Sequence, residues 1–417
     1  DDNRLVVHTS GVHGIEGYAG SAIQIAWLEG LLQYQQEKDS SSSSSPYSNH
    51  PTTIFIHAIN PWGMAHYRRV NENNVDLNRN ALLNFEEAVS RDPNLAHYQD
   101  FEAAFNPTSS DGFYIFWYEL GTTILELSKY NLWNLRSGIQ HLKKAMVTGQ
   151  YHQPKGIFYG GTTLQPSLDK LYTTMETVIL PQVMKKMMMR TTTKDDDADD
   201  ESGRTTTKPL LTTTWINVHT GLGISGRDTL LYEPTISKFD SQDLVETFPG
   251  AAVPFLDATN ENSKGKGEGD DVQQGYELTI GTLDSMLHQL LQKTSSSTTQ
   301  CAATSTTPTE EEDDSTTTDA NGSCSNNGDI DDTWIITQEF GTLPAILVGR
   351  ALILENRAYH HGSTSSSTDS TNNHADGMLV RSAFYPRTTT WRRALLERGI
   401  TRLYQAMQRR RRQREGA

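Results

Sequence analysis

The chain has little cysteine, a deficit of positive charge and no long hydrophobic run. Its two cysteines, Cys301 and Cys324, fall in one polar low-complexity stretch and so give little information about the redox compartment. Lys and Arg number 36 against 51 Asp and Glu, for a formal net charge of −15. This balance argues against a general nucleic-acid binder, because neutralising phosphates requires an excess of Lys and Arg. We therefore expect no nucleic-acid partner. No apolar run approaches the length of a bilayer-crossing helix, so we also expect no membrane span.

Four stretches rich in Ser, Thr and Asp contain too few apolar residues to offset the entropy lost on ordering. We expect these stretches to be disordered insertions, at residues 38–50, 191–208, 294–331 and 362–375. A basic tail at 408–417 is interpreted as a solvated helix end, with a nuclear address or a contact to an anionic surface as alternatives. The roughly 310 other residues suit one domain that extends over the whole chain, 1–417.

Short apolar, β-prone runs alternate with segments of helical periodicity along the chain. We expect strands at residues 4–9, 53–58, 210–218 and 334–340, and helices at 21–34, 117–146, 167–189, 345–354 and 391–407. This order predicts the α/β class, with a mixed, mostly parallel sheet and helices on both faces. Such sheets bind ligands beyond the carboxyl ends of their strands, where the polar motifs of this chain also lie.

Two motifs contain candidate metal ligands. In the string SGVHGIEG, His13 and Glu16 are three residues apart after the first strand, so both can face one cation. Such a pair alone is weak evidence, but the surrounding glycines favour a tight loop over a plain helix. His219 ends a later apolar strand and can complete a three-ligand set. Three ligands leave a position open for water, the arrangement of catalytic rather than structural zinc.

Two further motifs contain candidate groups for binding and proton transfer. The string RRVNENNVDLNRN supplies Arg68, Arg69, Asn78 and Arg79, whose planar donors suit a substrate carboxylate or an oxyanion. A surface loop with solvated arginines is the alternative for this stretch. Glu339 lies near the end of an apolar strand, where a carboxylate is costly to bury and is therefore either paired or functional.

The order of these motifs, His-x-x-Glu, Asn-Pro-x-Gly, Asp-x-Asn-Arg-Asn, His-Thr-Gly and Gln-Glu-Phe-Gly, resembles the zinc carboxypeptidase superfamily (carboxypeptidase A-like) and covers most of the chain outside the insertions. The strings SGVHGIEGYAGSA, RRVNENNVDLNRN and HTGLG are most similar to a branch near the aspartoacylase and succinylglutamate desuccinylase group.

This resemblance implies one Zn²⁺ per chain, with His13, Glu16 and His219 as ligands and Glu339 as general base. It also implies roles in substrate binding. Asn78 and Arg79 match the pair that binds a substrate carboxylate, Arg69 or its neighbour Arg68 would stabilise the oxyanion, and the substrate-capping tyrosine has three candidates, Tyr232, Tyr359 and Tyr385. His152, in the glycine- and aromatic-rich stretch 149–161, is interpreted as a substrate contact or a plain loop residue.

The expected function is therefore zinc-dependent hydrolysis of an amide bond next to a free carboxylate, as in a metallocarboxypeptidase. The substrate is a peptide or, in the alternative of an aspartoacylase-type deacylase, an N-acyl amino acid. An inactive module that binds peptide termini is the alternative from another class. The oligomeric state is open. We favour a soluble, cytoplasmic protein, and the absence of an initiator Met before Asp1 leaves a removed leader open.

Overall fold

A five-stranded sheet forms the centre of the computed structural model, which describes residues 3–39, 51–92, 94, 96–108, 117–118, 121–122, 135–186, 211–234, 236–253, 279–300, 332–362 and 371–410. The strands are β1 (Arg4–Thr9), β2 (Thr52–Ile56), β3 (Thr212–Gly221), β4 (Asp228–Leu231) and β5 (Thr333–Gly341). Their order is β2-β1-β3-β5-β4, and all neighbours are parallel except β4 and β5. The predicted α/β class and mixed, mostly parallel sheet are confirmed.

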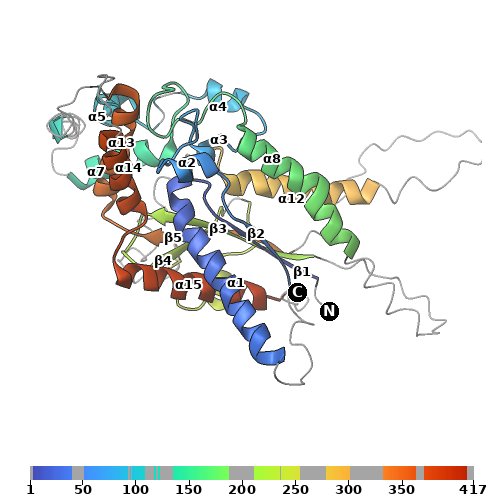
Figure 1. The fold of residues 1–417 in the computed structure, drawn as a ribbon. Coiled ribbons are helices and arrows are strands. Elements are labelled where there is room, and N and C mark those ends of the chain that lie inside the picture. Colours follow the sequence, from blue (N-terminus) through green and yellow to red (C-terminus); the bar gives the residue numbers. More distant parts are fainter. Residues whose placement is uncertain are drawn as a thin grey trace, which may run out of the picture.

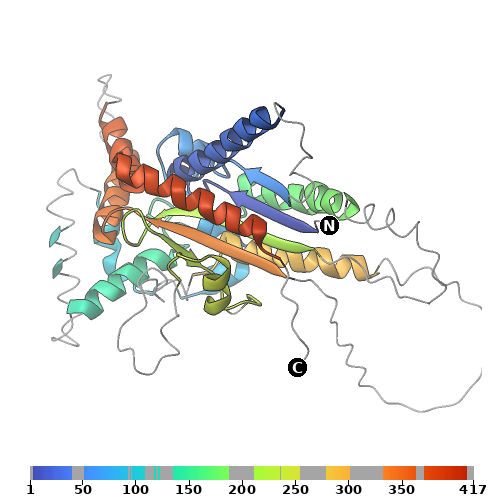
Figure 2. The ribbon, with the colours of Figure 1, turned by 90° about the horizontal axis from the view of Figure 1, so that it is seen from below.

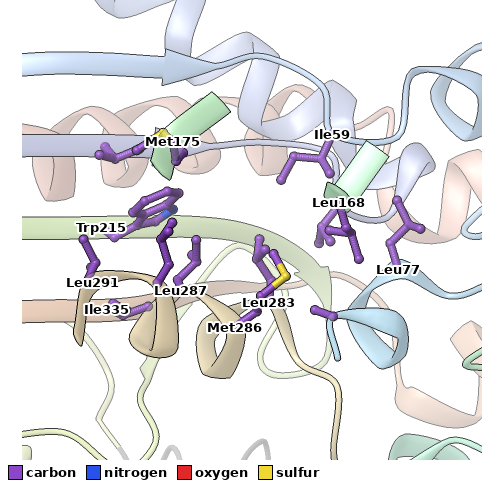
Figure 3. Packing of buried hydrophobic residues seen from close by; sticks show 14 of the residues in the cluster. Ile59, Leu77, Leu168, Met175, Trp215, Leu283, Met286, Leu287, Leu291 and Ile335 are labelled. Atoms are coloured by element: carbon purple, nitrogen blue, oxygen red, sulfur yellow. The ribbon is translucent and has the colours of Figure 1, made fainter. Parts of the chain in front are cut away.

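Alternating side chains along the strands build a separate hydrophobic core on each face of the sheet. Leu5, Val7 and Trp215 pack against α8 (Pro166–Thr174), its π-helical continuation (Met175–Ile179) and α12 (Leu283–Gln300). Figure 3 shows Trp215 between Met175 and the α12 residues Leu287 and Leu291. Their neighbours Val6 and Ile216 point to the other face, where α1 (Gly17–Asp39) and α15 (Thr389–Gln408) cover the sheet (Figure 1). Helices therefore lie on both faces, as predicted.

A third cluster lies beyond the carboxyl ends of the strands. It joins α7 (Leu135–Thr148), α13 (Ala345–His361) and α14 (Thr371–Phe384), which gather at one end of the sheet (Figures 1 and 2). The remaining elements are short: η1 (Gly14–Glu16), α2 (Pro61–Ala65), α3 (Leu77–Asn80), α4 (Glu86–Ser90), η3 (Gln99–Phe101), α5 (Glu102–Phe105) and α10 (Ser241–Thr247). This end of the molecule surrounds the site described below.

The predicted helices at 21–34, 345–354 and 391–407 lie inside α1, α13 and α15. The helix predicted at 167–189 is helical through residue 186, the last residue described there. For the helix predicted at 117–146, the structure describes 117–118, 121–122 and α7, all helical. The strand predicted at 210–218 instead runs to Gly221, which places His219 inside β3.

Short parts of the expected insertions belong to helices: 38–39 to α1, 294–300 to α12 and 371–375 to α14. Nearly all the rest of the four insertions, and 411–417 of the tail, lie outside the described residues. Among the described residues, no helix has the length and apolar character needed to cross a bilayer.

The expectation of a solvated basic tail is wrong for Arg409. Its side chain is buried at the start of β3 and β5, where it donates to the carbonyl oxygens of Thr213 and Asp332. It also pairs with the Asp332 carboxylate at 2.7 Å and lies over the ring of Trp334. These acceptors replace the water that an exposed guanidinium would have.

A buried ion pair fastens α15 to the sheet and predicts a stability effect. Asp228 of β4 is fully buried, and Arg402 Nε donates to it at 2.7 Å. Arg402→Met should lower the free energy of unfolding by about 3 kcal/mol, because it removes one partner of a buried charge. Urea denaturation measures the loss. Arg393→Met is the matched control on the same helix, since the Arg393 side chain is 79% exposed; it should change stability by less than about 0.5 kcal/mol. Equal effects of the two variants would contradict this account.

Candidate metal centre

The turn after β1 brings His13 and Glu16 into the interior. Gly11 has a positive φ of 67°, which lets the chain leave the strand sharply. At Gly14, a Cβ atom would come within 2.4 Å of the backbone of Gly63 and Met64, so only glycine lets η1 pack this closely on α2. His13 precedes η1 and Glu16 ends it, which leaves His13 Nδ1 2.8 Å from Glu16 Oε1.

The parallel pairing of β3 and β5 supplies the other two residues. His219 is directly opposite Glu339 in the register of these strands, and both side chains are almost fully buried. His219 Nδ1 lies 3.2 Å from Glu16 Oε2. Side chains at paired positions of parallel strands point to the same face, so the register places Glu339 beside the His13–Glu16–His219 group.

This group can hold a metal ion. One potential ligand atom from each of His13, Glu16 and His219 lies within 4.8 Å of the others, and the three residues are at most 3% exposed. Two imidazoles and a carboxylate are a donor set that suits Zn²⁺ and leaves a coordination position open. The structure therefore brings together the three residues that the sequence indicated as ligands.

The charges of these groups are strongly coupled. Burial works against ionisation of Glu16, but His13 and His219 outweigh it and hold the pKa of Glu16 well below its usual value. The pKa of His219 is raised, because Glu16 and Glu339 outweigh the effect of burial. Burial, followed by the nearby Glu16 charge, raises the pKa of Glu339 to about 7. The site thus contains one ionised carboxylate next to another that can take up or release a proton near neutral pH.

Asp76 contacts both His13 and Arg69, and the sequence analysis gave it no role. Its two carboxylate oxygens lie 3.0 Å from His13 Nε2 and 2.9 Å from Arg69 Nε. Despite full burial, Arg69 and His13 hold the pKa of Asp76 well below its usual value. An imidazole whose second nitrogen faces a carboxylate is fixed in orientation, as in many metal sites. The available signal was the Asp of the Asp-x-Asn-Arg-Asn string.

Only one of the two adjacent arginines reaches this centre. Arg69 donates to Glu16 at 3.1 Å as well as to Asp76. Arg68 turns away: its Nε donates to Glu355 at 2.5 Å, and its guanidinium lies 3.7 Å above the ring of Tyr359. Arg68 therefore fastens its loop to α13 rather than facing the candidate ligands.

Arg79 and Asn78 also have different positions. Arg79 lies in the wall of a cavity beside the centre, where Val147 and Asn78 carbonyl oxygens accept from its guanidinium. The Asn78 side chain accepts from the backbone N–H of Leu283 and does not line that cavity. Of these two residues, Arg79 and not Asn78 therefore lines the cavity.

The cavity has a volume of about 520 Å³, within the range of ligand pockets. His13, Glu16, Arg69, His219 and Glu339 line it together with apolar residues of α7 and α13. None of the three candidate capping tyrosines lines it, nor does His152, whose ring packs on Tyr98. Those tyrosines instead contact Ser241 (Tyr232), Arg68 (Tyr359) and Trp391 (Tyr385).

The chain belongs to the family described as "Protein of unknown function (DUF2817)", whose model matches residues 1–189 and 271–398. The matched segments contain every residue of the centre except His219. No curated protein and no solved structure matches the chain.

Asp76→Asn should weaken metal binding, because the amide is neutral and holds the His13 imidazole less firmly. We expect a loss of about 10- to 100-fold in zinc affinity, measured by competition with a chromophoric chelator. Asp100→Asn is the matched control, since Asp100 also pairs with a histidine, His97, but at the surface. Unchanged zinc affinity in Asp76→Asn would show that Asp76 does not support the ligands.

Proposed function

We propose that this chain is a zinc-dependent hydrolase of the metallocarboxypeptidase type, which cleaves an amide bond next to a free carboxylate. One observation carries the proposal: the β3–β5 register sets a buried carboxylate, Glu339, directly beside the buried His13–Glu16–His219 group. The order of motifs that resembles zinc carboxypeptidases supports the same reaction class.

His13, Glu16 and His219 would hold the zinc ion. When bound, zinc supplies a water of lowered pKa and a Lewis acid for the scissile carbonyl. Asp76 would keep the His13 imidazole in the tautomer that leaves Nδ1 free to coordinate, because its carboxylate accepts a hydrogen bond from Nε2–H.

Glu339 is the proposed general base and acid. A buried carboxylate at this position can accept a proton from water and return it to the leaving amine. The backbone N–H of Leu222 donates to Glu339 Oε1 at 2.9 Å and fixes the direction of the carboxylate. Glu339 lies in the cavity wall, where a substrate amide can approach it.

Arg69 and Arg79 would each bind a different negative charge of the substrate. Arg69 lies among the candidate ligands, so its guanidinium can stabilise the oxyanion that forms on the scissile carbonyl. Arg79 would bind the free carboxylate and thereby orient the scissile bond. Because its contacts to Val147 and Asn78 already hold the guanidinium, little entropy is lost on binding.

Glu339→Gln should keep its zinc and lose at least about 100-fold in kcat, because the amide cannot transfer the proton. Zinc content by elemental analysis and turnover of N-acyl amino acids and short peptides are measured on the same preparation. The matched control is Glu397→Gln at the surface, whose side chain is 69% exposed; it should leave zinc content and turnover unchanged. Full activity of Glu339→Gln would remove it from the mechanism.

Arg79→Gln should lower kcat/KM by about 10- to 100-fold for substrates with a free carboxylate, because one charged hydrogen-bonding partner is lost. The same substrates with a terminal carboxamide are the control, since their turnover does not depend on charge pairing at Arg79. An equal loss for both kinds of substrate would mean that Arg79 acts only through its contacts to the protein.

A further inference from the structure

The cavity beside the metal centre has two chemically different parts. Its charged part is the group around Glu16, in which the side chains contact one another. Its other part is a wall of apolar side chains, mostly from α7 and α13 at the carboxyl ends of the strands, with one residue of α14. These side chains are Leu142 and Met146 of α7, Ile346, Val348 and Leu352 of α13, and Phe384 of α14.

Helices α7 and α13 lie against each other in this wall. A Cβ atom placed on Gly349 of α13 would come 2.7 Å from Cε of Met146 on α7, so Gly349 is at a close approach between them. Besides the charged group and Arg79, the described residues of the cavity wall offer three polar side chains: Trp117, Lys143 and Thr220.

This wall is a poor environment for a peptide. Each further residue of a peptide brings one N–H and one C=O group, and leaving such groups buried without partners costs about 1–3 kcal/mol each. Helix backbones bond to themselves and offer no donors or acceptors along their sides. An alkyl chain has no such groups and gains free energy with every methylene that it buries.

We propose that the substrate is an N-acyl amino acid with a medium-length alkyl chain. The chain lies along the α7–α13 wall, the amide carbonyl is next to Glu339, and the amino-acid carboxylate pairs with Arg79. The identity of the cleaved bond rests on the proposed function, whereas the binding of an alkyl chain rests on the wall alone. Hydrolysis adds water across the amide and releases a fatty acid and a free amino acid.

The test is a series of substrates with the zinc-loaded protein: N-acetyl-, N-butanoyl-, N-hexanoyl- and N-octanoylglycine. Burial of one methylene is worth about 0.8 kcal/mol, which corresponds to about a fourfold rise in kcat/KM. We expect a rise of at least about 100-fold from the acetyl to the octanoyl substrate. Glycine peptides of matching length form the second arm and should show no such rise.

Gly349→Leu tests the location of the chain. The added Cβ would come 2.7 Å from Met146 Cε, so the Met146 side chain must shift; the larger side chain narrows the cavity at the wall and should flatten the dependence of kcat/KM on acyl length. Leu347→Ala is the matched control on the same helix, because Leu347 is 42% exposed and does not line the cavity. Its dependence on acyl length should equal that of the unaltered protein. A dependence that persists in Gly349→Leu would overturn the assignment of this wall.

Binding without turnover separates the two proposals. Calorimetry of the acylglycines with zinc-loaded Glu339→Gln should show tighter binding and a more negative heat-capacity change as the chain lengthens. Such binding, with hydrolysis of neither the acylglycines nor the glycine peptides by the unaltered protein, would support the alkyl site and overturn the proposed function. Hydrolysis at a rate that does not increase with acyl length, or that increases with peptide length, would support the function and overturn the alkyl site.

Discussion

The whole centre depends on one buried carboxylate. Glu16 has four partners: Oε1 accepts from Arg69 and lies near His13 Nδ1, and Oε2 accepts from the backbone of Thr220 and lies near His219 Nδ1. Burying an ionised carboxylate is costly unless charge and hydrogen bonds compensate it. Glu16 therefore ties the turn after β1, the loop that carries Arg69 and the end of β3 into one arrangement.

The apolar surroundings of this arrangement strengthen its electrostatics. Charges interact more strongly where water is excluded, so Arg69 and Glu339 affect a charge in the cavity more than they would at the surface. The same apolar helices that exclude water also form the wall of the cavity. Glu339 and the apolar side chains of α7 and α13 thus line the same cavity beyond the sheet.

Much of the fold and of the centre could be predicted because their signals are local. The strands β1, β3 and β5 contain short apolar runs; His13 and Glu16 follow β1, and His219 and Glu339 lie near the carboxyl ends of β3 and β5. Since parallel strands meet at a common edge, residues at their carboxyl ends come together without further information.

The features that could not be predicted depend on contacts between distant parts of the chain. Nothing in the local sequence indicates which of Arg68 and Arg69 faces the candidate ligands. Arg68 points away from them because it pairs with Glu355, 287 residues away. Likewise, Arg409 belongs to a run of arginines, and only the acceptors at the start of β3 and β5 bury it. The role of Asp76 was hidden for the same reason, because its partner His13 is 63 residues away.

The most direct test of the central claim is the metal content of the purified protein. Elemental analysis should find about one zinc ion per chain after dialysis against zinc, and His13→Ala and His219→Ala should each lose it while remaining folded by circular dichroism. A protein that takes up no zinc, or that keeps it in both variants, would contradict the account.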